Sequence, residues 1–282
     1  STPGKCGCTG VHPSAAALPV IAAPGETGGK IRNTIRMDLI SIACWRMDDT
    51  GFEFGSSFVR SDTKDDFAAL AKLRDQYPGA PMSIFGHADP VGDDAFNKQL
   101  SGRRAQSIYA VLVRDTGIWE TLYQAAGSAE GWGQGSITHM LTALGYNTAA
   151  GYADTVKQFQ QDHALQPVDG IAGKDTRARL FAAYMDYLSP AKWAKSDFLG
   201  AGADTGGKGD YQGCGEFNPQ RVFSQEEEQR FLQAEHKAER NELNAINRRV
   251  VIFLFRPGTV VTPAKWPCPR TTEGTAGCVK RQ

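Results

Sequence analysis

The sequence predicts an α/β domain that is interrupted by an inserted helical domain. Short runs rich in β-branched and aromatic residues alternate with helical patterns near both ends of the 282-residue chain, whereas the middle shows helical patterns alone. Alternating strands and helices predict a sheet covered by helices. A purely helical stretch between two such parts predicts an insertion into one α/β domain.

The first part of the chain is predicted to hold two strands and two helices. In chain order they are a strand at Asp38–Met47, a helix at Thr63–Tyr77, a strand at Pro81–Phe85 and a helix from Asp93 or Asp94 to about Arg114. Apolar residues three and four positions apart identify the helices. Proline, glycine and aspartate mark the ends of these elements.

The middle and the end of the chain are predicted to hold four helices and one strand. They are helices near Ile137–Leu144, Tyr152–His163 and Asp175–Leu188, a long charged helix from Ser224 to about Ile246, and a strand at Val250–Phe255. Ser224 with Glu227 has the spacing of a capping box. Two glycine-rich stretches, Gly127–Gly135 and Gly200–Gly215, separate the helical middle from its neighbours.

The overall charge argues against several classes of partner. Lys plus Arg equals Asp plus Glu, at 31 each, so the formal net charge is zero. A neutral chain has no long-range attraction for nucleic acid or for an anionic membrane. No run approaches the ~18 apolar residues of a membrane helix. We therefore expect no nucleic-acid partner and no transmembrane segment in this chain.

No pattern in the sequence indicates catalysis, a metal or a cofactor. The five histidines lack the spacing of a metal-ligand pair such as His-Glu-x-x-His. No Cys–His or Ser–His arrangement stands out, and acid pairs such as Asp48-Asp49 resemble turns or helix caps. We therefore expect a protein that is not an enzyme and that needs no cofactor.

Six cysteines are present, and two of them suggest a disulfide. Cys268 and Cys278 flank a loop rich in Gly, Thr and Pro. A bond between them would stabilise a tail that has little core of its own, and two free thiols are the alternative. Cys44 lies in an apolar run and is expected in the core.

One helix face carries an unusual charge. Five residues spaced three or four apart share this face: Asn97, Leu100, Arg104, Ile108 and Val111. Arg104 therefore lies on an apolar stripe and needs a partner, because an unpaired buried charge is costly. Asp89 follows a strand end, where ligands of open α/β sheets gather. Together the two charges could hold a zwitterion, or they could simply pair with each other.

Four motifs resemble the OmpA-like peptidoglycan-binding domain. In chain order they are Gly86-His87-Ala88-Asp89-Pro90-Val91-Gly92 with Asn97, Leu100-Ser101-Gly102-Arg103-Arg104-Ala105, Gly213-Cys214-Gly215-Glu216-Phe217-Asn218-Pro219, and Asn247-Arg248-Arg249-Val250. The resemblance covers most of residues 37–115 and 205–255. It implies an α+β fold, an OmpA-like α/β sandwich with a mixed sheet.

The resemblance also implies a ligand and its contacts. In that family an aspartate and an arginine, which match Asp89 and Arg104, hold the diaminopimelate of the wall peptide. Asn97 matches a supporting polar residue. Arg248 and Arg249 match basic residues near the site, and Arg249 is expected to contribute. Where the family usually has threonine this chain has Ala88, so weaker affinity is expected.

The inserted segment resembles a second wall-binding domain, the three-helix peptidoglycan-binding domain. The resemblance covers residues 137–188 and rests mainly on the turn Val168-Asp169-Gly170-Ile171-Ala172-Gly173 with Thr176. It implies a small three-helix bundle. Asp169 is expected to be structural. The core is expected to consist of Leu141, Leu144, Val156, Phe159, Leu180 and Tyr184.

These features predict a domain order and a function. The order is an extended lead-in (1–36), an OmpA-like domain in two parts (37–126 and 201–256) around the helical insert (127–200), and a tail with the disulfide (257–282). The expected function is non-catalytic binding of peptidoglycan through diaminopimelate, as an anchor or targeting module in the periplasm or cell envelope. The alternatives are the targeting part of a secreted wall hydrolase or toxin, and an adaptor of a contractile secretion system, whose partner would be a secretion-system or envelope protein.

Overall fold

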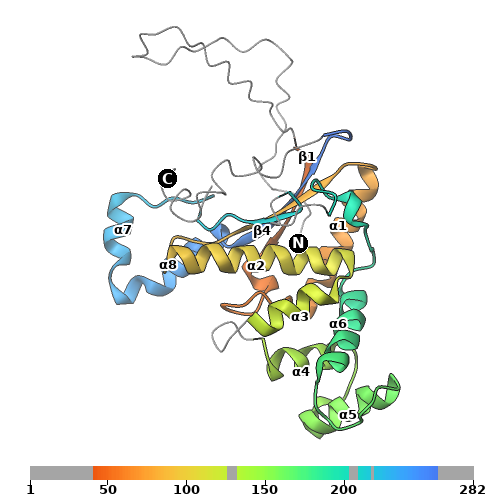
Figure 1. Cartoon of the computed structure of the whole chain (residues 1–282). Coiled ribbons are helices and arrows are strands. Elements are labelled where there is room, and N and C mark those ends of the chain that lie inside the picture. The colour runs from red at the N-terminus through yellow and green to blue at the C-terminus, as the bar shows by residue number, and fades with distance from the viewer. Residues whose placement is uncertain (1–40, 126–131, 203–208, 217–218, 260–282) are drawn as a thin grey trace.

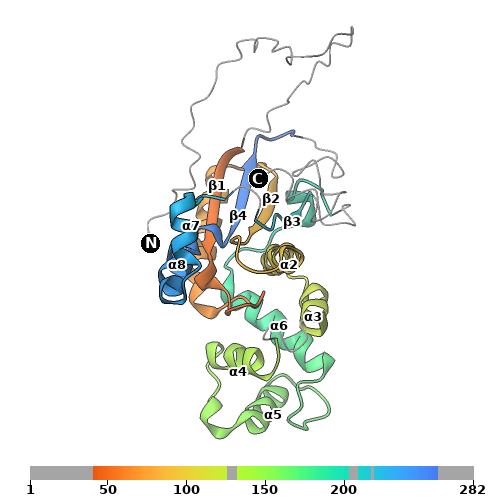
Figure 2. The same cartoon turned by 90° about the vertical axis from the view of Figure 1, so that its left-hand side faces the viewer.

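The computed structural model describes residues 41–125, 132–202, 209–216 and 219–259. Its centre is a four-stranded sheet (Figure 1) whose strands lie in the order β1-β4-β2-β3 (Figure 2). The strands are β1 (Ser41–Asp48), β2 (Met82–His87), β3 (Tyr211–Gly213) and β4 (Arg249–Phe255). β4 runs antiparallel to β1 and β2, whereas β3 runs parallel to β2. The sheet is therefore mixed, and the predicted α+β class is confirmed.

Helices pack against the sheet and extend away from it. They are α1 (Lys64–Gln76), α2 (Asp94–Val113), α3 (Thr116–Ala125), α4 (Gln134–Ala143), α5 (Tyr152–Asp162), α6 (Lys174–Leu188), α7 (Gln225–Phe231) and α8 (Lys237–Asn244). α2 packs on β2 and β3, and α1 packs on β1. Figure 2 shows α3 and α6 below α2, with α4 and α5 at the end of the molecule away from the sheet.

The central strands are apolar along their whole length. All six residues of β2 are buried, and β4 is buried at every position except Phe253. A strand that is buried on both faces has a continuous run of apolar residues instead of alternating apolar and polar ones. The run Val250–Phe255 has this pattern and therefore predicted a strand. Gly86 in β2 lies so close to α2 that an added Cβ would be 1.9 Å from the Ser101 carbonyl oxygen. Only glycine permits this approach of helix and strand.

The ends of α2 follow from local chemistry. The carboxylate of Asp93 accepts a hydrogen bond from the Phe96 backbone N–H at 2.8 Å, so Asp93 is the cap. Asp94 is the first helical residue. At the other end, Arg114 has the left-handed conformation with φ 59°. The helix thus spans nearly the predicted range and delivers one long buried face to the sheet.

Three features of the fold differ from the sequence-based expectation. α3 was not expected, although Trp119 and Leu122 bury its inner face. β3 is a short strand within the glycine-rich stretch, where pairing with β2 rather than residue preference decides its conformation. The predicted long helix after Ser224 is broken at Gln233, whose backbone is extended. Its charged sequence offers few buried apolar contacts to keep one straight helix in place.

Aromatic side chains join the inserted helices to the sheet domain. The ring of Phe58 stacks on Tyr184 of α6 at 5.9 Å between centroids and meets Trp132 edge-on at 5.3 Å. The Tyr184 hydroxyl donates to the Val59 carbonyl at 3.0 Å, and Trp132 Nε1 donates to Ser57 Oγ at 2.9 Å. The described helices of the insert therefore share one apolar core with the sheet domain.

Five of the six residues predicted for the core of the insert are buried, and Leu144 is half-buried. Within the described ranges no helix combines the length and the apolarity needed to cross a membrane.

Candidate functional site

The topology of the sheet brings three loops to one edge. Arg249, the first residue of β4, pairs with Asp48 at the end of β1 and with His87 at the end of β2. Residues just beyond these positions must therefore lie near one another. They are Asp49 after β1, Asp89 after β2 and Arg248 before β4. Strand ends of open sheets are common ligand sites for the same geometric reason.

Arg104 enters this edge from α2 and is buried there. Its Nε donates to the carbonyl oxygen of Ser56 at 2.9 Å, and its Nη1 donates to Asp49 Oδ1 at 2.5 Å. The guanidinium carbon lies 4.8 Å from the centre of the Phe52 ring. Burial lowers the pKa of Arg104 from its ordinary value, and the Asp49 carboxylate partly offsets this effect. The charge on the apolar stripe is thus held by a carboxylate.

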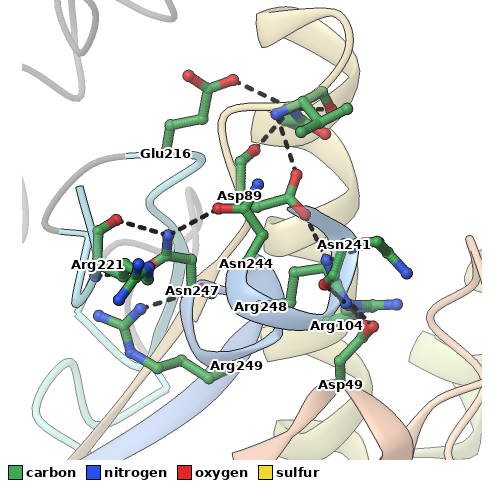
Figure 3. Close-up of polar contacts among 12 residues, drawn as sticks. Asp49, Asp89, Arg104, Glu216, Arg221, Asn241, Asn244, Asn247, Arg248 and Arg249 are labelled. Carbon is green, nitrogen blue, oxygen red and sulfur yellow. Dashed lines mark hydrogen bonds and ion pairs between the residues drawn. The ribbon is translucent and has the colours of Figure 1, made fainter. Parts of the chain in front are cut away.

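Arg248 connects the two carboxylates of the site (Figure 3). Its Nε donates to Asp49 Oδ2 at 2.7 Å, and its Nη1 donates to Asp89 Oδ2 at 2.5 Å. Asn241 of α8 accepts from both terminal nitrogens of Arg248, at 3.1 and 3.2 Å. Burial acts to lower the pKa of Arg248, but the hydrogen bonds to Asp89 and Asp49 outweigh it and raise the pKa. Arg104, Asp49, Arg248 and Asp89 therefore form a chain of alternating charges, called here the four-charge network.

Asn97 fixes the loop that carries Asp89. Its side-chain Nδ2 lies 3.1 Å from the carbonyl oxygens of both Asp89 and Val91, and 3.0 Å from Glu216 Oε1. The Asp89 carboxylate also accepts from the Val91 backbone N–H at 3.0 Å. Burial raises the pKa of Glu216, and the hydrogen bond from Asn97 opposes this rise. The position of Asp89 is thus set by its own loop and by α2.

The four charges lie at two depths. The exposed fraction of the side chain is 6% for Arg104 and 9% for Asp89, against 18% for Arg248 and 22% for Asp49. The first two charges are the deeper pair, and the other two lie nearer the solvent.

The structure gathers three of the four predicted ligand-binding residues at this edge. Asp89, Arg104 and Asn97 contribute to one connected set of polar contacts. The alternative, a direct Asp89–Arg104 pair, does not form among the described contacts, because Asp49 and Arg248 lie between the two residues.

The side chain of Arg249 has different partners from the side chain of Arg248. Its Nη1 donates to the Asn247 carbonyl at 3.0 Å, whereas Arg248 pairs with Asp89. Consecutive residues at the start of a strand point to opposite sides, so only one of the two can face the Asp89 loop. The sequence analysis expects Arg249 to contribute, whereas the arginine that contacts Asp89 is Arg248. A ligand contact of Arg249 stays a prediction.

Sequence reasoning missed Asp49 entirely. It was read with Asp48 as part of a turn, and it does lie in a short 3₁₀ turn, Asp49–Gly51. The signal that could have found it is its place directly after the first strand. That signal becomes useful only when the strand order is known.

The inserted helices contain a turn built around one buried amide. Gln160 Nε2 donates to Asp169 Oδ1 and to the Ile171 carbonyl, both at 3.0 Å. Its Oε1 accepts from the backbone N–H groups of Asp169 and Gly170. Asp169 thus has the structural role expected of it. In the described part of the chain, no three His, Cys, Asp or Glu side chains lie close enough to hold a metal.

The cysteine pair Cys268 and Cys278 lies outside the described residues, and its disulfide stays a prediction. Of the cysteines within the described ranges, Cys44 is half-buried in β1 and Cys214 is buried after β3.

The arrangement suits the capture of a zwitterion rather than bond cleavage. A guanidinium can hold a carboxylate with two parallel hydrogen bonds, and a carboxylate can hold an ammonium. Both carboxylates of the four-charge network are bound to arginine. Neither Asp49 nor Asp89 is thus placed as a free general base at this edge.

Comparisons with known proteins identify the two parts of the chain. Residues 51–138 match the model of the OmpA family, and residues 136–180 match the model "Putative peptidoglycan binding domain". The chain is 38% identical to outer membrane porin F of Pseudomonas aeruginosa over 82 residues, which are 29% of this chain and 23% of the porin. It is also 38% identical to porin F of Pseudomonas fluorescens over 82 residues, 25% of that porin.

A third relative, outer membrane protein Omp38 of Acinetobacter baumannii, is 31% identical over 67 residues, which are 24% of this chain and 19% of Omp38. The matched region thus spans a quarter or less of the length of these relatives. The chain contains an OmpA-like domain, followed from residue 136 by a segment of the peptidoglycan-binding type.

Proposed function

We propose that this chain binds peptidoglycan without cleaving it, and that Arg104 and Asp89 hold the diaminopimelate residue of the stem peptide. Arg104 would bind the carboxylate at the end of diaminopimelate, and Asp89 the ammonium on the same carbon. Asn97 would keep the Asp89 loop in place. We assign the nearby basic position to Arg248 rather than to Arg249, since Arg248 contacts Asp89.

The observation that carries the proposal is the buried Arg104 beside the Asp89 loop, at the edge where three strand ends meet. A charge buried this deeply in an apolar face stabilises a fold poorly compared with apolar residues of similar volume. Its presence is better explained by recognition of a charged ligand. The match to the OmpA family model, which includes both residues, supports the same ligand class.

The inserted helices add a second contact with the wall in this proposal. Their match to a model described as peptidoglycan-binding supports it. Two weak sites on one polymer gain avidity when both can engage at once. The chain would then act as an anchor or a targeting module in the cell envelope or the periplasm.

Sedimentation with purified sacculi tests this function directly. We expect the wild-type chain to sediment with sacculi that contain diaminopimelate. Arg104→Ala should sediment less, because it loses the site in the sheet domain. Some sedimentation should remain, because the insert would still bind the wall. Arg114→Ala is the matched control, since this arginine lies at the far end of α2, where it pairs with Asp186.

The same sacculi, labelled with a dye, test for cleavage. We expect binding without release of dye. Release by the purified chain would show a wall hydrolase instead, and a chain that remains in the supernatant would refute wall binding altogether.

A further inference from the structure

We propose that the ligand site is occupied by the chain itself: the Asp49–Arg248 ion pair holds the positions that the carboxylate and ammonium of the ligand would take. This inference rests on the proposed function and adds two residues that determine affinity. Diaminopimelate would bind by exchange, in which the ligand's zwitterion replaces an internal pair of the same two charges.

The donors of Arg104 show why Asp49 must give way. Nε is used by the Ser56 carbonyl, and Nη1 is used by Asp49. No hydrogen bond joins Nη2 to any residue in the described part of the chain. A carboxylate that binds in the bidentate manner needs two neighbouring donors. Because Nε faces the backbone, those donors are Nη1 and Nη2, and Asp49 occupies Nη1.

The hydrogen bonds that Asp89 accepts show that Arg248 must also move. Oδ1 accepts from the Val91 backbone N–H, and Oδ2 accepts from Arg248 Nη1. An ammonium that approaches Oδ2 would meet the guanidinium of Arg248, and two like charges in one partly desolvated place repel each other. The ammonium of the ligand can therefore reach Asp89 fully only when Arg248 moves away.

The depths of the four charges fit an exchange at the mouth of the site. Asp49 and Arg248 are about two to four times more exposed than the Arg104 and Asp89 side chains they contact. They can turn toward solvent, whereas Arg104 and Asp89 are fixed by backbone contacts. Asn241 would retain Arg248 near the site after it leaves Asp89. The exchange conserves the count of ion pairs, so the internal pair lowers affinity without abolishing it.

Titration of the full-length chain with a monomeric muropeptide tests the exchange. Asp49→Asn removes the internal carboxylate and keeps the size of the side chain. We expect its affinity for a diaminopimelate muropeptide to rise about tenfold, which corresponds to about 1.4 kcal/mol. The same muropeptide with lysine in place of diaminopimelate lacks the competing carboxylate, so its affinity should change less than about threefold, or ~0.65 kcal/mol.

Arg248→Gln is the second variant. It frees Asp89 for the ammonium and should also tighten binding of the diaminopimelate muropeptide. If Asp49→Asn does not fold, the affinity of Arg248→Gln alone tests the exchange. Asp186→Asn is the matched control, because it makes the same change in an arginine-paired aspartate far from the site and should leave affinity unchanged.

The possible results separate this inference from the proposed function. An affinity of Asp49→Asn that equals or falls below that of the wild type overturns the exchange while wall binding stands. A wild type and variants that all fail to bind the muropeptide refute both. A wild type that binds too weakly to measure beside a variant that binds clearly supports both.

Discussion

At the scale of single residues, one side-chain amide fixes the loop that carries Asp89. The Asn97 side chain contacts two backbone carbonyls of the Asp89 loop and one carboxylate, Glu216. Backbone carbonyls buried without a partner cost about 1–3 kcal/mol. Asn97 therefore contributes both to stability and to the placement of Asp89.

Replacing Asn97 with alanine should reveal both contributions. We expect Asn97→Ala to lower the free energy of unfolding by about 1–3 kcal/mol, since the carbonyls of Asp89 and Val91 lose their donor. Binding of a diaminopimelate muropeptide should weaken as well. Gln99→Ala, an exposed substitution two positions along the same helix, should change neither quantity. Urea unfolding and titration of the two variants provide the comparison, and equal results for both would refute the role of Asn97.

At the scale of elements, the site could be predicted in part because helix periodicity is a local property. The spacing of Asn97, Leu100 and Arg104 placed all three on one buried face, and all three are buried in α2. The roles of Asp49 and Arg248 depend on which strands are neighbours. Strand order is a long-range property that residue spacing does not encode. The spacing of residues therefore could not predict that β1 and β4 are neighbouring strands.

The break between α7 and α8 also shows a limit of prediction from local sequence. The capping box of Ser224 and Glu227 was correctly predicted, and its two hydrogen bonds are 2.9 and 3.2 Å long. The end of the helix was wrong, because the extended residue Gln233 carries no local breaker signal. Local chemistry fixed the start of this element, whereas no local signal marked its end.

One histidine links helix α4 to the sheet domain and should make stability depend on pH. His139 Nε2 accepts a hydrogen bond from the Ser61 backbone N–H at 3.0 Å, which requires a neutral ring. Burial lowers the pKa of His139, with a further contribution from Arg60, while Asp62 acts in the opposite direction. A folded-state pKa below the unfolded value of about 6.5 means that protonation favours unfolding. Its contribution is complete above pH ~6.5 and is lost as the pH falls through the lowered pKa.

We therefore expect the thermal midpoint of the wild type to fall more than that of His139→Gln between pH 7.5 and pH 5, a range of about 2.5 units that spans the ordinary histidine pKa. Glutamine can keep an acceptor near Ser61 but does not titrate. The difference between the two proteins isolates His139 from the other titrating groups. Parallel curves would show that His139 does not couple docking of α4 to pH.

At the scale of the whole molecule, the inserted helices and the sheet domain share one aromatic core. Phe58, from the loop after β1, contacts Trp119 of α3, Tyr184 of α6 and Trp132. The division at residues 127–200 remains a prediction. Removal of these residues would uncover Phe58 and Trp119, so a separable insert would leave a less stable remainder.

This shared core predicts cooperative unfolding. We expect one transition by calorimetry for the described helices and the sheet together. Tyr184→Phe should lower the midpoint of that whole transition, since it removes a hydrogen bond to Val59 worth about 1 kcal/mol. Two resolved transitions, with only one shifted by the substitution, would show that the insert folds on its own.

The proposed diaminopimelate site is tested most directly by calorimetric titration of the full-length chain with a monomeric diaminopimelate muropeptide, run beside thermal melts. We expect Arg104→Ala and Asp89→Ala each to lose about 2–5 kcal/mol of binding free energy, or roughly 30- to several-thousand-fold in affinity. Arg104→Lys should recover only part of the loss, because lysine cannot make the bidentate contact. Arg114→Ala should bind like the wild type. If both alanine variants bind as tightly as the wild type and lose only stability, the four-charge network is structural and the ligand site lies elsewhere.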